Sequence, residues 1–128
     1  MRSLTLGVLP ETLAVCRLAN GAALPPLPAT GFASITRTAD ERSVVCAEDA
    51  APAGATVNGG WRAIVVRGPL AFELTGILVS VAAPLAEAGI SIFAMSTYDT
   101  DTVLVKAELL PRALSVLRAA GHIVEEGS

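Results

Sequence analysis

Two short segments carry the residue types best suited to holding a small charged molecule. The first is Leu74, Thr75, Gly76 and Ile77, at the start of an apolar helical pattern. Backbone N–H groups at a helix start are unpaired and carry a partial positive charge, which suits a carboxylate. A glycine there lets a ligand approach the backbone closely. The residues alone favour a plainer interpretation, an ordinary loop in which Thr75 caps the helix.

The second segment closes an expected strand and contains Thr97, Tyr98, Asp99 and Asp101. A carboxylate in such a turn can pair with the ammonium or guanidinium group of a ligand. Because aspartates are common in turns, Asp99 is better explained as a turn residue, whereas the two interpretations balance for Asp101. If this turn meets the helix start in space, the two form a small polar pocket on an apolar scaffold.

A third, weaker candidate segment lies in the first half of the chain. Ser43 and Val44 would face the same pocket if the two halves packed edge to edge. The neighbouring Glu41 is at least as well explained as a solvated loop charge.

Composition limits the class of protein. The chain has 128 residues, of which 52% are hydrophobic and 16% charged, with a net charge of −3. This describes a globular protein with one domain or two very small ones. Its Lys and Arg residues are scattered, so no nucleic-acid surface and no polybasic membrane contact is expected. The apolar stretch 76–86 is too short to cross a bilayer, no secretory signal is apparent, and a cytoplasmic location is predicted. Cys16 and Cys46 are expected to be buried free thiols.

The second half of the chain predicts two helices among four strands. Apolar residues recur at steps of three and four from Leu74, which predicts a helix that is kinked at Pro84 and ends at Gly89. The expected order is strand 61–67, helix 74–88, strand 90–98, turn 99–101, strand 102–106, helix 108–120 and strand 122–125. This is an α+β fold of the ferredoxin-like βαββαβ type, an antiparallel sheet with helices on one face.

The first half predicts strands but no long helix. Alternation over 3–9 and 12–18 predicts two strands, joined as a hairpin by a turn at Pro10 and Glu11. Residues 20–31 form a loop, and further strands are expected at 32–38 and 43–47. Because residues 48–60 are small and polar, we place the boundary there and expect units at 1–59 and 60–128.

The second half resembles ACT domains, small regulatory modules that bind amino acids. The matching residues are GWRAIVVRGPLAFELTGILVSVAAPLAEAGISIFAMSTYDTDTVLVK followed by ALSVLRAAGH. The combination of LTG with ISIF and STYDTD is similar to the CASTOR-type group, in which ACT units occur in tandem. RTADERSVVC in the first half is similar to a segment of its short bacterial members.

This resemblance implies a degenerate ACT-like first half beside a full ACT domain, with a ligand held where neighbouring units meet. It places Leu74 to Ile77 in the family's ligand-contacting loop and Asp101 where the family's arginine sensors contact their ligand. The implied function is a non-catalytic sensor that binds a free amino acid. A homodimer is kept open.

Two other functions were weighed. The chain has one histidine, His122, and no glycine-rich phosphate loop, no dinucleotide fingerprint and no metal-spaced Cys/His cluster. Neither a cofactor nor enzymatic activity is therefore expected. Asp99 and Asp101 supply only part of a divalent-cation site, so a metal-dependent enzyme is the weakest alternative. A dimerisation or interaction module with a vestigial pocket is the stronger one.

Overall fold

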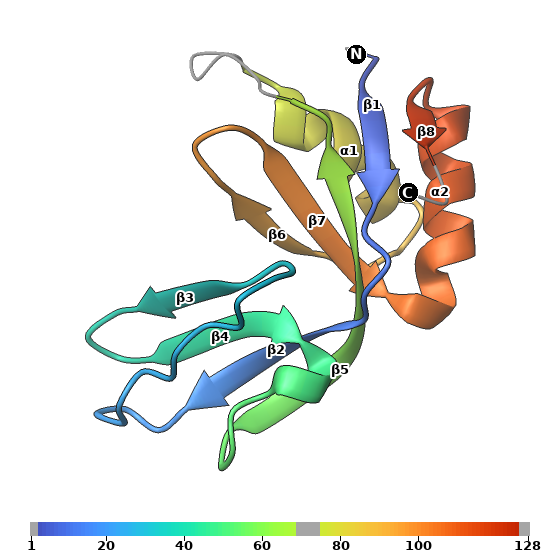
Figure 1. The fold of residues 1–128 in the computed structure, drawn as a ribbon. Helices are drawn as coiled ribbons and strands as arrows, with labels where there is room; N and C mark the ends of the chain where they lie inside the picture. Colours follow the sequence, from blue (N-terminus) through green and yellow to red (C-terminus); the bar gives the residue numbers. More distant parts are fainter. Residues whose placement is uncertain (1–2, 69–74, 126–128) are drawn as a thin grey trace. The chain divides into compact units, whose positions relative to one another are not determined.

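A computed structural model describes residues 3–68 and 75–125. Its contacts divide the chain into two units (Figure 1). Unit 1 comprises Met1–Pro10 and Arg62–Ser128, and unit 2 comprises Glu11–Trp61. The first strand therefore belongs with the second half of the chain, which differs from the expected division into 1–59 and 60–128.

Unit 1 contains the predicted order of four strands and two helices, with one additional strand at its beginning. Its elements are β1 (Thr5–Val8), the second part of β5 (Thr56–Val66), α1 (Ile77–Glu87), β6 (Phe93–Ser96), β7 (Asp101–Lys106), a 3₁₀ turn (Ala107–Leu109), α2 (Leu110–Ala119) and β8 (Ile123–Glu125). The strands lie in the order β6, β7, β5, β1, β8, so that β1 separates β5 from β8. The α+β, ferredoxin-like prediction is confirmed.

One core joins both helices to one face of this sheet. Alternate residues of β1, β5 and β7 are buried in it together with the apolar stripe of each helix. The sheet contributes Leu6, Ile64 and Val103 among others, and the helices contribute Val81, Leu85, Leu114 and Leu117. The predicted helical period over 74–88 therefore identified the buried side of α1.

Unit 2 is an antiparallel sheet without an α-helix. Its strands are β3 (Ser34–Arg37), β4 (Arg42–Ala47), β2 (Leu13–Leu18) and the first part of β5, in that spatial order, and a 3₁₀ turn (Glu48–Ala50) follows β4. Cys16, Val44 and Cys46 are buried on one face of it. Both cysteines are free, as predicted.

Two predictions about the first half are wrong. Residues 3–9 and 12–18 do not form a hairpin, since β1 pairs antiparallel with Ile64–Val66 and β2 pairs antiparallel with residues 56–61 of β5. Pro10, which lacks an N–H, interrupts the strand without reversing the chain. In addition, residues 56–60 belong to β5, whereas the strand was expected to begin at Trp61.

No helix among residues 3–68 and 75–125 is long and apolar enough to cross a membrane.

Candidate ligand-binding site

The start of α1 has no side-chain cap among the described residues. Gly76 is the N-cap, with a left-handed φ of 76°, and has no side chain that could cap the helix. Thr75 is exposed and makes no hydrogen bond within the described residues, so it does not act as the cap that the plainer interpretation required. No acidic residue occupies the first turn. The positive end of the helix is thus uncompensated by any described side chain.

Three of the four predicted residues at this helix start are described, and Leu74 lies outside the described residues. Ile77 is 5% exposed and packs in the core of unit 1. Any contact that Ile77 makes with a ligand would therefore come from its backbone N–H.

The turn between β6 and β7 is well ordered by its own hydrogen bonds. The N–H of Thr97 donates to the carbonyl of Thr100 at 2.8 Å. The Thr100 hydroxyl donates to the carbonyl of Val66, the last residue of β5. This hydrogen bond holds the turn at the end of β5, the strand that precedes α1 in the sequence.

Asp101 is held by its neighbour across the hairpin. Ser96 and Asp101 are register partners, and the Ser96 hydroxyl donates to Asp101 Oδ1 at 2.5 Å. The Asp101 side chain is half-buried, whereas Asp99 is exposed and Tyr98 is 81% exposed. A carboxylate with one oxygen held and the other without a hydrogen-bond partner among the described residues is positioned to accept from an ammonium group.

Ser43 and Val44 lie in unit 2, on neighbouring positions of β4 that face opposite sides of the sheet. Val44 is 2% exposed, within the core of its own unit, and Ser43 is half-buried. A ligand contact by either remains a prediction.

His122 is buried and both of its ring nitrogens are occupied. Nδ1 lies 3.1 Å from the backbone N–H of Leu4, and Nε2 lies 2.7 Å from the carbonyl of Ser80. Because the Leu4 N–H donates to Nδ1, Nε2 must carry the proton that the Ser80 carbonyl accepts. His122 is therefore a buried histidine with both ring nitrogens hydrogen-bonded.

Among the described residues, no group of three or more His, Cys, Asp or Glu side chains is placed to hold a metal ion.

Comparison with known proteins places this arrangement in a family. A model of the ACT domain matches residues 56–119, and a model of an N-terminal domain matches residues 11–54. The chain belongs to the ACT domain family. The first of these matches along the chain ends at residue 54, and the second begins at residue 56.

Solved structures share the ACT fold of this chain. Protein Atu0741 from Agobacterium tumefaciens is 38% identical, with a TM-score of 0.93, over 100% of this chain and 96% of that one. VC0802 from Vibrio cholerae, a protein of unknown function, is 23% identical with a TM-score of 0.71, over 92% of this chain and 90% of that one.

The allosteric aspartate kinase of Clostridium acetobutylicum is 11% identical with a TM-score of 0.63. The match covers 90% of this chain and 34% of the kinase, so the ACT chain spans about a third of that enzyme's length.

Two residues of the candidate site were not predicted from the sequence. Ser96, which positions Asp101, and Thr100, which fastens the turn to β5, were not among the candidates. The hairpin register is the signal that would have found Ser96, because strands flanking a turn at 97–100 place residue 96 opposite residue 101.

Proposed function

We propose that this ACT protein is a non-catalytic sensor of a free amino acid, built from two ACT-like units in the manner of the CASTOR-type group. The uncapped start of α1 would receive the ligand carboxylate at Thr75, Gly76 and Ile77. Asp101, with Thr97 and Tyr98 beside it, would receive the ammonium or the side chain. Ligand binding would favour one arrangement of the protein over another because the ligand interacts differently with each.

The observation that carries this proposal is Asp101. Its carboxylate is held by Ser96 in a turn that the Thr100 hydroxyl fastens to the end of β5. A site of this kind is preorganised, so little ordering free energy opposes binding. The likeness to an allosteric aspartate kinase supports a regulatory role at the level of the fold.

A thermal-shift screen against the common amino acids, followed by calorimetry on any that stabilise the protein, tests the proposal. We expect saturable binding of at least one amino acid that Asp101→Asn weakens about tenfold or more, because a charge-assisted bond is lost. Asp40→Asn is the matched control, since Asp40 is an exposed aspartate in the β3–β4 turn of unit 2. Equal loss in both variants would remove Asp101 from the site, and stabilisation by no amino acid would contradict the sensor.

One observation favours a second candidate, a dimerisation module. Strands β6 and β8 lie at the two ends of the unit 1 sheet, each bonded to a single neighbour in the described part of the chain. Edge strands can pair with another chain. Sedimentation of the protein with and without amino acids separates the candidates, since a pure dimerisation module would associate to the same extent in both.

A further inference from the structure

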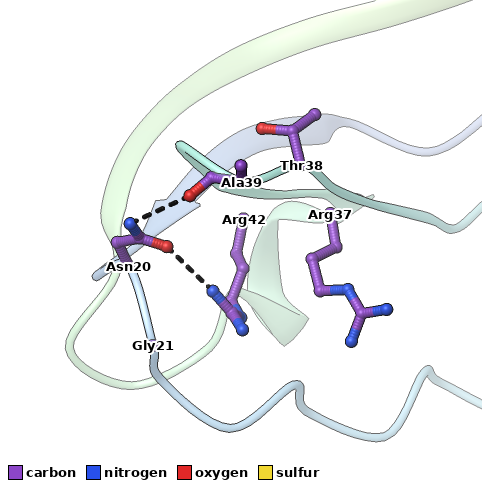
Figure 2. A pocket seen from close by; sticks show the side chains of 6 residues that line it. All are labelled: Asn20, Gly21, Arg37, Thr38, Ala39 and Arg42. Carbon is purple, nitrogen blue, oxygen red and sulfur yellow. Dashed lines mark hydrogen bonds between the residues drawn. The ribbon is translucent and has the colours of Figure 1, made fainter.

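A cavity of about 590 Å³, widely open to solvent, lies in unit 2 and is lined by residues of the β3–β4 hairpin and of the turn after β2 (Figure 2). The lining residues are Asn20, Gly21, Arg37, Thr38, Ala39 and Arg42. None of them is among the residues assigned to the amino-acid site. Two arginines and no acidic side chain in one cavity give it a positive lining.

The two arginines face each other across the hairpin. Arg37 and Arg42 are register partners of β3 and β4, and Figure 2 shows their side chains extending to the same side of the hairpin. Like charges directly opposite one another are destabilising. Asp40 and Glu41 lie in the adjoining turn, yet no carboxylate of the described residues comes within 4.0 Å of either guanidinium. The two cations thus have no counter-charge within 4.0 Å in the part of the chain that the structure describes.

One of these arginines is fixed in place. Arg42 Nη1 donates to Asn20 Oδ1 at 3.0 Å, and Asn20 Nδ2 donates to the carbonyl of Ala39 at 3.2 Å. Arg42 Nε is buried without a hydrogen-bond partner among the described residues. The hydrogen bond to Asn20 orients the Arg42 guanidinium. Most of the N–H groups of this guanidinium have no partner among the described residues.

Arg37 differs in having no anchor. Its side chain is exposed, and it makes no hydrogen bond or ion pair within the described part of the chain. An arginine held by Asn20 and an exposed arginine without a partner among the described residues can contact an anion from two neighbouring strands. Guanidinium groups bind carboxylate and phosphate oxygens in pairs, which suits a compact oxyanion.

We infer that this cavity is a binding site for a small oxyanion, the carboxylate or phosphate group of a metabolite. It lies within unit 2 and is independent of the amino-acid site proposed for unit 1. The anion would neutralise the Arg37–Arg42 pair and bridge β3, β4 and the turn at Asn20 and Gly21.

Amide NMR titration with inorganic phosphate and with succinate, at constant ionic strength set with sodium chloride, tests the site. The expected result is a saturable shift of the amides of Asn20, Gly21 and residues 37–42 with at least one of the two anions. The anion that binds more tightly identifies whether the site takes phosphate or carboxylate.

Three charge-neutralising variants sharpen the test. Arg37→Gln and Arg42→Gln should each weaken the anion about tenfold or more. Arg17→Gln is the matched control, since Arg17 is an exposed arginine that pairs with Ser43 on the opposite face of the same sheet. It should change the affinity less than twofold.

Arg37→Gln removes a side chain without partners in the described structure, so the variant should fold, and its dispersed amide spectrum would verify this. Shifts that fail to saturate with either anion would overturn the site. An Arg17→Gln effect as large as that of Arg37→Gln would reduce the binding to general attraction by positive charge and would also overturn it.

Discussion

Ser96 and Asp101 act as one structural unit at the proposed amino-acid site. The Ser96 hydroxyl donates to one oxygen of the Asp101 carboxylate. This hydrogen bond fixes the orientation of the carboxylate and so the direction of its second oxygen. We predict that Ser96→Ala keeps the fold and weakens the amino acid about threefold to tenfold, because a single hydrogen bond to a charged, half-exposed group is lost. Calorimetry measures this. Ser115→Ala, at an exposed position of α2, is the control and should bind as the wild type does.

Cys16 and Cys46 are predicted to be unreactive in the folded protein. Burial raises the pKa of the Cys16 thiol, and the neighbouring Cys46 adds to this rise. Burial also raises the pKa of Cys46, which the Cys16 hydrogen bond partly offsets and the charge of Asp49 reinforces. Because the thiolate is the reactive form, alkylation at neutral pH should be at least tenfold slower than in urea-unfolded protein.

The raised pKa values of the same two thiols determine how the free energy of unfolding changes with pH. A raised folded-state pKa means that the native protein keeps protons which the unfolded chain releases. Stability from these groups is therefore complete below the unfolded pKa, about 8.5, and is lost as pH rises through the higher folded values. Urea midpoints should fall above about pH 9 and fall less in a Cys16→Ala/Cys46→Ala variant. An equal fall of the urea midpoint in the wild type and in the variant would contradict the assignment of this pH dependence to the two thiols.

At the scale of elements, His122 replaces a backbone hydrogen bond that α1 lacks. Pro84 lies inside the helix and has no N–H to give the Ser80 carbonyl, which would otherwise accept from residue 84. The His122 Nε2–H takes that place, and Nδ1 accepts from Leu4 in the segment before β1. The His122 side chain, which lies just before β8, thus links α1 to the segment that precedes β1.

His122→Ala should cost about 2–4 kcal/mol of unfolding free energy, because it leaves two buried backbone groups unpaired and opens a cavity. Urea denaturation measures the cost. Pro84→Ala supplies an N–H to Ser80, so the double variant should lose less than the sum of the single changes by about 1 kcal/mol. Strict additivity would show that the Ser80 bond does not matter.

Strand β1 belongs to the core of unit 1. Leu6 is fully buried there, and its neighbours pair with β5 on one side and β8 on the other. Leu6→Ala should destabilise the protein by about 2–5 kcal/mol. It should speed amide exchange in β8 and in residues 64–66 more than in the β3–β4 pair. Leu24→Ala, at a side chain 41% exposed, should do neither.

The elements themselves were largely predictable, and their long-range pairing was not. Helical spacing marked the buried face of α1, and alternation marked the strands. Alternation does not say which strand a strand will pair with. The parallel pairing of β1 with β8 joins residues more than a hundred positions apart, and a turn signal at Pro10 suggested a hairpin in its place.

The candidate sites show the same limit. LTGI and TYDTD could be proposed as a site from the sequence because their residue types suggest a binding chemistry. Ser96 was missed because its role depends on register, and so was the Arg37–Arg42 pair. Arginines five positions apart look scattered in a sequence, and only the β3–β4 hairpin makes them neighbours.

At the scale of the whole molecule, each of the two units is proposed to bind a different kind of small molecule. Unit 1 offers an uncapped helix start and an acidic turn, which suit a zwitterion. Unit 2 offers a pair of arginines, which suits an anion. The full-length match to Atu0741 shows that a protein of nearly the same length combines both units.

The proposed function requires a free amino acid to bind unit 1 at the start of α1 and the β6–β7 turn. Amide NMR titration with the most stabilising amino acid tests it most directly. We expect saturable shifts concentrated at residues 75–77 and 96–101, lost in Asp101→Asn and retained in Asp40→Asn. Shifts confined to residues 37–42, or a spectrum unchanged by every amino acid, would contradict it.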